Sequence, residues 1–280
     1  MLFLQYCLPQ KLLSKIVGWF ANCRLRWFKN QFIARFCVAY PVNLHEAERT
    51  QIEEYHSFND FFTRSLKAGE RVIDVDPKVI ISPVDGFVSA YGKIQDKSLI
   101  QAKGKTFSLD ALLADKKELA QQFRFGDFLT AYLAPANYHC FHMPLDGVLQ
   151  QMIYVPGKLF SVNQNAVNNI DNLFARNERV ICIFETEIGP VAYIAVGAML
   201  VGSIAMEWHG VVNPKHGHQV KTYSYQHAPQ KISLKKGDKV GHFQMGSTVI
   251  MLLPPNKIQW AKAFQADEPL RFGERIATLL

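Results

Sequence analysis

Acidic residues are missing from the first 45 positions of this 280-residue chain. The same stretch carries six cationic residues: Lys11, Lys15, Arg24, Arg26, Lys29 and Arg35. The whole chain has a formal net charge of +7, so these six leave the rest of the protein nearly neutral. Binding to nucleic acid usually needs basic residues across the contact face. A charge confined to one end therefore argues against a nucleic-acid partner.

Paired cysteines are also missing, and no signal peptide is expected. The five cysteines are scattered and form no C-x-x-C pair, which argues against a disulfide framework or a zinc site and favours a reducing compartment. Pro9 and the charges that follow it interrupt the apolar start, and no small-residue cleavage site follows. The 49% hydrophobic content predicts a folded protein with a real core.

A transmembrane helix is not expected either, although residues 188–206 carry no charge over 19 positions and are long enough to span a bilayer. Gly189, Pro190, Gly197 and Gly202 interrupt this run. Glycine and proline at these intervals are typical of short elements. We interpret the run as two buried strands with a turn near Gly197.

Residues 9–39 predict a helix in two pieces with a break near Asn22. Apolar residues recur at helical spacing on one side, with Trp19 and Trp27 among them and the cations opposite. A basic amphipathic helix with aromatic residues fits the surface of an anionic membrane. The alternative is a helix that packs its apolar stripe, which includes Phe28, Phe32 and Phe36, on the protein core.

Strand patterns dominate from about residue 70 onward. Short apolar or alternating runs bounded by glycine, proline or Asp-Gly predict strands at 78–81, 86–91, 128–133, 147–155, 180–185 and 248–253. Helical patterns are expected at 58–65, with Asn59 as the N-cap, and at 109–123 and 163–168. The predicted fold class is α+β: a β-rich, mostly antiparallel core, barrel- or sandwich-like, behind a helical N-terminal region.

The segment most informative about chemistry is the triplet Gly246-Ser247-Thr248, which directly precedes an apolar strand. Glycine leaves its carbonyl unshielded and permits the unusual backbone angles that an attack by the Ser247 hydroxyl would need. Such an attack forms an ester by an N-to-O acyl shift. Elimination then leaves dehydroalanine, which hydrolyses to a pyruvoyl group and ammonia. By itself, however, the triplet predicts only a turn.

The surrounding sequence KGDKVGHFQMGSTVIMLL at 236–253 resembles the Leu-Gly-Ser-Thr processing site of phosphatidylserine decarboxylases. Met245 replaces the usual leucine, an exchange of similar volume. Further family motifs are matched in order by FNDFFTR at 58–64, SPVDG at 82–86, YHCFHMP at 138–144, YVPGKLFSVN at 154–163 and VGAMLVGS at 196–203. The resemblance thus spans nearly the whole chain.

The resemblance implies that Asp85, His142 and Ser247 form a triad that cleaves the chain between Gly246 and Ser247. A serine hydroxyl needs a base within hydrogen-bond reach, and a carboxylate orients that imidazole. Without the resemblance, Asp85 in its Pro-x-Asp-Gly context is a typical turn aspartate. The resemblance also makes His139 a second active-site group, and either histidine could return a proton during decarboxylation. Because these two histidines lack a third ligand, no metal site is expected.

The implied function is pyruvoyl-dependent decarboxylation of phosphatidylserine to phosphatidylethanolamine and CO2 in phospholipid biosynthesis, with pyruvate, derived from Ser247, as the covalent cofactor. Residues 1–60 would be the membrane-association region and 61–280 the catalytic domain. The cleaved chains, 1–246 (beta) and 247–280 (alpha), would stay together as a heterodimer or assemble further. We expect a peripheral protein on an anionic membrane surface, at the cytoplasmic side of the cell inner membrane.

Two alternatives from other classes stay open. One is a serine hydrolase that uses Ser247 intact, although Gly-x-Ser-x-Gly is absent around it. The other is a non-catalytic peripheral lipid-binding module in which Gly246-Ser247 is only a turn.

Overall fold

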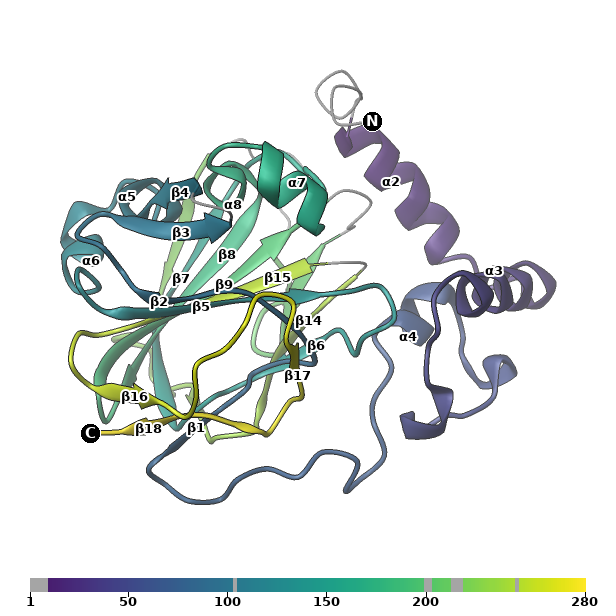
Figure 1. The fold of residues 1–280 in the computed structure, drawn as a ribbon. Coiled ribbons are helices and arrows are strands. Elements are labelled where there is room, and N and C mark those ends of the chain that lie inside the picture. The colour runs from purple at the N-terminus through teal and green to yellow at the C-terminus, as the bar shows by residue number, and fades with distance from the viewer. Residues whose placement is uncertain (1–9, 103–104, 199–202, 213–218, 245–246) are drawn as a thin grey trace.

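The computed structural model describes residues 10–102, 105–198, 203–212, 219–244 and 247–280. Gly246 and Met245 lie outside the described residues, and so does part of the predicted motif at 196–203. At the N-terminus, α2 (Gln10–Ala21) and α3 (Arg26–Ala39) confirm the helix in two pieces with a break near Asn22. Figure 1 shows both helices beside the β-rich body of the protein.

The inner side of α3 packs against the short helix α4 (Phe58–Phe62). The Phe32 ring stacks on Phe58 with centroids 4.4 Å apart, and Phe36 meets Phe58 edge to face at 5.0 Å. By contrast, Trp19 and Trp27 are 71% and 77% exposed. The predicted apolar stripe is therefore divided: its α3 phenylalanines pack on the protein, whereas the tryptophans face solvent.

Lys29, which the sequence places among the cations, is buried. Its Nζ donates hydrogen bonds to the carbonyl oxygens of Ile52 at 2.9 Å and Glu53 at 3.2 Å. These carbonyls belong to η2 (Ile52–Glu54), which follows η1 (Leu44–Glu46) in the connection from α3 to α4. Lys29 therefore fixes α3 to that connection.

The N-cap of α4 corrects the sequence prediction. Ser57, not Asn59, caps the helix: its hydroxyl accepts a hydrogen bond from the backbone N–H of Asp60 at 3.1 Å. Asn59 lies inside the helix, where its Nδ2 donates to the Asn22 side chain at 3.0 Å. An asparagine is a good cap in isolation, but here its amide links α4 to the end of α2.

The main sheet has nine antiparallel strands and confirms the predicted β-rich α+β class. Its order is β12 (Lys221–Ser224), β7 (Gly147–Val155), β8 (Arg179–Thr186), β9 (Gly189–Gly197), β15 (Ser247–Leu253), β5 (Asp127–Leu133), β2 (Gly86–Lys93) and β17 (Pro269–Leu270), with β13 (Ser233–Leu234) also on β7. Within the described residues no sheet closes into a barrel.

Both faces of this sheet are covered. In β15, Val249 and Met251 enter one hydrophobic cluster, while Ile250 and Leu252 enter the other. This alternation is the period-2 pattern of a strand with cores on both sides. The helices α5 (Leu109–Leu112), α6 (Lys117–Gln121), α7 (Gln164–Asn169) and α8 (Leu173–Arg176) and the hairpin of β3 (Ser98–Ala102) and β4 (Lys105–Ser108) lie over one face (Figure 1).

Two small sheets lie on the other face, which gives the sandwich-like arrangement. One is β1 (Val79–Ile81), β18 (Arg275–Leu279) and β16 (Ile258–Trp260). The other is β11 (Gly210–Val211), β10 (Ile204–Met206), β14 (Lys239–Phe243) and β6 (Cys140–His142). Residues of β6, β10 and β14, such as Phe141, Met206 and Phe243, enter the core cluster on this face.

The helix predicted at 109–123 is two short helices instead. The chain turns at Ala114 and Asp115, both with φ of 58° in the left-handed region. Leu112 of α5 and Leu119 of α6 enter the same hydrophobic cluster under the sheet. The break lets both α5 and α6 pack on that cluster. Helix propensity depends on local sequence and does not include this packing.

The uncharged run at 188–206 supplies two buried strands, as predicted. β9 lies in the centre of the main sheet, whereas β10 belongs to a small sheet. Residues 199–202 between them lie outside the described part of the chain. Across the described residues, no helix combines the length and apolar character that crossing a membrane requires.

Candidate active site

The predicted site residues Asp85 and Ser247 lie at one edge of the main sheet. β2 and β15 both begin where β5 ends, because each is antiparallel to β5. Ser247 pairs with Leu133 of β5, and Gly86 packs on the backbone of the same strand end. Neighbouring strands lie about 4.8 Å apart, so the backbones of β2 and β15 are separated by about 10 Å across β5. Of Ser247 only the backbone is described.

Gly86 permits this close approach. A Cβ at Gly86 would lie 2.3 Å from the carbonyl oxygen of Tyr132, a distance that no side chain can occupy. The glycine that follows Asp85 therefore has a packing role in addition to its role in the turn. It sets Asp85 directly at the end of β5.

The Asp85 carboxylate is buried and fully engaged. Arg71 donates to it from Nε, at 3.0 Å to Oδ1, and from Nη2, at 2.5 Å to Oδ2. The backbone N–H of Phe272 donates to Oδ1 at 2.9 Å. The charge of Asp85 is therefore balanced by a guanidinium from a segment 14 residues earlier in the chain.

His142 lies on β6 beside Asp85. Its backbone N–H donates to the Pro83 carbonyl at 2.9 Å, and its ring stacks on Phe272 with centroids 3.8 Å apart. Nδ1 lies 2.9 Å from the carbonyl oxygen of Gly237, and Nε2 lies 3.0 Å from the Tyr138 hydroxyl. Because a carbonyl only accepts, Nδ1 carries the proton and Nε2 is left as the acceptor.

Burial lowers the pKa of His142 to about 4, and the Gly237 hydrogen bond offsets only part of that effect. The imidazole is therefore neutral at neutral pH, with a lone pair on Nε2. This is the protonation state that a general base requires. Gly237 and Tyr138, which fix the tautomer, stand in the quoted motifs, but nothing in the sequence singled them out.

His139 is fully buried on the opposite side of the same segment. Its ring stacks on Phe62 of α4 with centroids 4.0 Å apart, and Nε2 lies 3.4 Å from the Pro135 carbonyl oxygen. Burial, and secondarily the charge of Arg64, lower its pKa to about 3. Nδ1 has no hydrogen-bond partner in the described part of the chain. His139 is thus a neutral group with unused hydrogen-bonding capacity.

Arg64 holds the loop that leads to His139. It is buried, and its Nη2 donates to the carbonyl oxygens of Ala136 at 3.0 Å and Asn137 at 3.2 Å. Desolvation lowers the pKa of the guanidinium from its ordinary value. Arg64 is the last residue of the motif at 58–64, so this motif has a physical role at the site.

The structure brings Asp85 and His142 to the same place without joining them directly. Both contact Phe272, Asp85 through the backbone N–H and His142 through the ring. Among the described residues no hydrogen bond links Asp85 to either histidine. The side chains of His139 and His142 also point to opposite sides, because residues an odd number of positions apart in an extended segment face opposite ways. The catalytic assignments therefore stay predictions.

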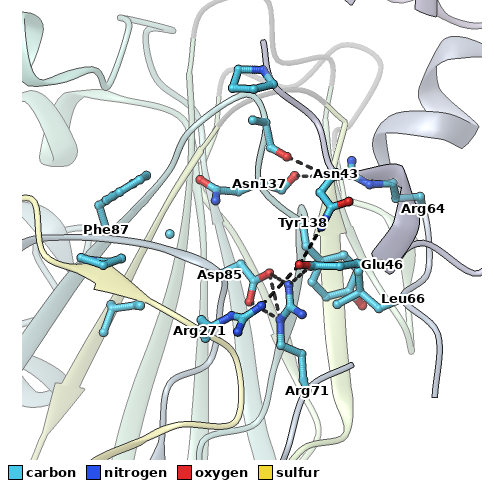
Figure 2. A pocket seen from close by; sticks show the side chains of 15 residues that line it. Asn43, Glu46, Arg64, Leu66, Arg71, Asp85, Phe87, Asn137, Tyr138 and Arg271 are labelled. Atoms are coloured by element: carbon cyan, nitrogen blue, oxygen red, sulfur yellow. Dashed lines mark hydrogen bonds and ion pairs between the residues drawn. The ribbon is translucent and has the colours of Figure 1, made fainter. Parts of the chain in front are cut away.

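A pocket of about 310 Å³ opens beside Asp85. Figure 2 shows that its charged side chains come from distant parts of the sequence, with Glu46, Arg71 and Arg271 gathered around Asp85. Asn137 and Tyr138 line another wall, and Arg64 lies on the side of the N-terminal region. The pocket lies where the N-terminal region meets the sheet edge.

The fold and this site define an α+β protein with two buried neutral histidines, one of which, His142, lies beside a strand-end carboxylate. Residues 58–278 match the family described as phosphatidylserine decarboxylase, and residues 2–41 match a second family description, PSD. The chain belongs to the phosphatidylserine decarboxylase family.

Similar proteins cover nearly the whole chain. A Pseudomonas fluorescens protein named phosphatidylserine decarboxylase proenzyme is 48% identical over 271 residues, covering 96% of this chain and 94% of that protein. A protein of the same name from Pseudomonas putida is 47% identical over 98% of this chain and 95% of its own length. One from Pseudomonas aeruginosa is 46% identical over 98% of this chain and 94% of its own.

Proposed function

We propose that this chain is a phosphatidylserine decarboxylase proenzyme, which cleaves itself and then converts phosphatidylserine to phosphatidylethanolamine and CO2. The observation that supports this proposal is that Asp85 and the backbone of Ser247 lie at the same end of β5, with His142 beside the Asp85 turn, in a member of this family. Asp85 precedes β2, Ser247 begins β15, and His142 lies beside the Asp85 turn. Family membership supports the reaction, and the geometry supports the residues.

Self-cleavage begins with the Ser247 hydroxyl, whose oxygen attacks the carbonyl carbon of Gly246. His142 Nε2 accepts the hydroxyl proton and returns it to the departing backbone nitrogen as the C–N bond breaks. The product is an ester between the two residues. Elimination releases the Gly246 carboxylate and leaves dehydroalanine, which takes up water and loses ammonia to become the pyruvoyl group. The neutral state of His142 supports its assignment as the base.

Asp85 contributes a negative charge beside the imidazolium that forms in this step. Its carboxylate already favours the protonated form of His142, although burial has the larger, opposite effect. In the described arrangement the Gly237 carbonyl orients the imidazole through Nδ1. Two groups thus share the work that one aspartate performs in a serine-protease triad.

The pyruvoyl cofactor would stand at the first residue of β15, between Leu133 of β5 and Gly197 of β9. The two predicted histidines suit such an uncharged group, because both are neutral and His139 Nδ1 is buried without a described partner. A pyruvoyl group supplies a carbonyl that accepts the electrons released when the substrate carboxylate leaves. His139 or His142 would relay a proton from water to the substrate α-carbon, since each imidazole is neutral at rest.

The two cleaved chains, 1–246 and 247–280, stay associated. The shorter chain begins with β15, whose described side chains from Thr248 to Leu253 are buried between β5 and β9. It also contributes β18, which pairs with β1 of the longer chain. Separation would expose a central strand of the main sheet, so the heterodimer is the stable product.

Residues 1–60 form the membrane-association region and 61–280 the catalytic domain. The exposed Trp19 and Trp27 and the cations of the first 45 residues suit an anionic surface, and phosphatidylserine is itself an anionic lipid. We place the protein peripherally on the cytoplasmic face of the inner membrane.

The test is whether the active protein is cleaved between Gly246 and Ser247. Purified protein should give a 34-residue fragment, residues 247–280, whose N-terminus is blocked to sequencing and whose mass fits a pyruvoyl group. Ser247→Ala should abolish both the fragment and the release of CO2 from phosphatidylserine. Thr248→Ser, which keeps a hydroxyl at the neighbouring position, is the matched control.

Other outcomes would replace the proposal. An intact chain that hydrolyses esters and loses that activity in Ser247→Ala identifies a serine hydrolase. An intact chain that binds vesicles without either activity identifies a lipid-binding module.

A further inference from the structure

The segment that carries Arg71 passes over the two loops that hold Asp85 and His142. Gly273 has a φ of +91°, and a Cβ there would lie 2.6 Å from the Val72 carbonyl oxygen. A Cβ at Gly237 would lie 2.7 Å from Ile73 Cδ1. Glycines at both positions therefore let the segment after Arg71 lie against two loops. One loop contains Phe272 and Gly273, and the other contains Gly237, whose carbonyl accepts the hydrogen bond from His142.

The side chain of Arg71 is only 8% exposed, and it uses every nitrogen of its guanidinium. Nε donates to both Asp85 oxygens, at 3.0 and 3.2 Å, and Nη1 donates to the Glu70 carbonyl at 2.9 Å. Nη2 is shared between Asp85 Oδ2 at 2.5 Å and Glu46 Oε2 at 2.6 Å. These bonds raise the pKa of Arg71 further above its ordinary value, so its charge is permanent.

Glu46 is the outer end of this chain of charges. It belongs to η1 in the N-terminal region, where Asn43 Nδ2 donates to its Oε1 at 3.0 Å. Arg271 Nη2 lies 3.3 Å from the same oxygen. Burial alone raises the pKa of the Glu46 carboxyl, but the hydrogen bonds and charge of Arg71 outweigh it and the pKa lies below its ordinary value. Glu46 is therefore an ionised anchor for Arg71.

We infer that Arg71 is a positioning residue for self-cleavage, which holds Asp85 beside His142, and that Glu46 anchors it from the N-terminal region. This inference rests on the proposed function, since it assigns Asp85 to the cleavage step. A planar guanidinium with every nitrogen engaged allows one orientation of the carboxylate, which a lysine cannot reproduce. The Glu46–Arg71–Asp85 chain thus makes the cleavage site depend on a correctly seated N-terminal region.

A merely structural ion pair predicts something different. A buried pair of this kind often contributes little net stability, yet removing one partner destabilises the fold and would impair every activity alike. A positioning residue acts on the step that needs Asp85. The two chemical steps of this protein separate these roles, because cleavage occurs once and decarboxylation afterwards by the cleaved enzyme.

The experiment measures cleavage half-time, then kcat per cleaved chain, for Arg71→Gln, Arg71→Lys and Glu46→Gln. We expect Arg71→Gln to slow cleavage by about 10- to 100-fold, the loss typical of a displaced catalytic group. Arg71→Lys should recover part of the rate, and Glu46→Gln should cost a few-fold. In each variant the kcat of the cleaved enzyme should fall less than the cleavage rate, and the ratio of the two losses is the readout.

Arg49→Gln is the matched control. Arg49 also makes a two-pronged ion pair in the N-terminal region, with both bonds to Asp60 at 2.7 Å, but it does not contact Asp85. Its cleavage half-time should equal that of the parent protein. An equal slowing in Arg49→Gln would overturn the inference, because the effect would then be general.

Two further results would overturn it. One is parental cleavage in Arg71→Gln; the other is a loss of kcat and melting temperature in step with the loss of cleavage, including in Arg71→Lys. Faster cleavage would mean that Arg71 restrains Asp85 and would overturn it as well. If the parent chain is never cleaved, or Ser247→Ala yields the same fragment, the proposed function fails along with the inference.

Discussion

The sheet edge and the N-terminal helical region are held in place in different ways. At the edge, Asp85 is held by Arg71 and Phe272, and His142 by Gly237 and by the nearby Tyr138. Phe272 and Gly237 come from segments far from the residues they hold. In the helical region, α3 is held mainly by its phenylalanines and Lys29, while the tryptophans project outward. Groups assigned to chemistry are thus fixed from several directions, and groups assigned to a membrane are left exposed.

The two histidines should show the largest change in rate when they are replaced. We expect His142→Asn to slow self-cleavage by at least about 1000-fold, because no other neutral base with a fixed tautomer lies beside Asp85 in the described residues. His139→Asn should still be cleaved, but its kcat for decarboxylation should fall. Mass spectrometry of the fragment and CO2 release per cleaved chain measure the two steps separately. Cleavage at the parental rate in His142→Asn would remove it from the role of base.

The next effect concerns the exposed tryptophans. Replacing Trp19 and Trp27 together by alanine should weaken binding to anionic phosphatidylserine-containing vesicles by at least about 100-fold, given about 1.5–3 kcal/mol for each of the two large apolar side chains that become buried. Co-sedimentation with vesicles measures the change, and activity on water-soluble short-chain substrate should stay unchanged.

Phe125→Ala is the control for that experiment. Phe125 is 61% exposed and follows α6, away from the N-terminal helices. Equal weakening by Phe125→Ala would mean that the binding surface is not confined to the N-terminal region. The assignment of membrane binding to that region alone would then be wrong.

The strand pattern of the core could be predicted from the sequence because its signals are local. The alternating run at 147–155 and its flanking Asp-Gly and proline delimit β7 at the predicted residues. The Asn59 cap and the single helix at 109–123 were wrong for a shared reason. In both cases a local preference lost to a contact with another element, Asn22 for the cap and the common core surface for the helix.

The site was predictable only where a motif carries it. Asp85, His139, His142 and Ser247 stand in segments that resemble family motifs, whereas Arg71 stands in none. The sequence around Arg71 does not show that its guanidinium reaches Asp85, because this contact depends on the path of an extended segment over Gly273 and Gly237. Long-range partners of this kind can be identified only from the three-dimensional structure.

A smaller effect distinguishes Lys29 from the other cations. Lys29→Met should lower the free energy of unfolding by about 1–3 kcal/mol, because the Ile52 and Glu53 carbonyls lose their donor. Arg26→Gln on the exposed side of the same helix should leave the stability unchanged and weaken vesicle binding instead. Denaturant melts paired with vesicle co-sedimentation measure both. The opposite pattern would exchange the roles of the two cations and contradict the observed burial.

The smallest effect is a pH dependence at His139, where the sheet edge meets α4. Burial holds the pKa of His139 at about 3, below the ordinary value of 6.5 that it regains on unfolding. As the pH falls below 6.5 the unfolded chain therefore binds a proton that the folded chain does not, so folded stability declines towards pH 3. His139→Phe keeps an aromatic ring on Phe62 and removes this titration. Its unfolding midpoint should fall less than that of the parent between pH 7 and pH 5. An equal fall in both proteins would show that His139 is not held neutral by burial, and the assignment of a neutral group beneath α4 would then be wrong.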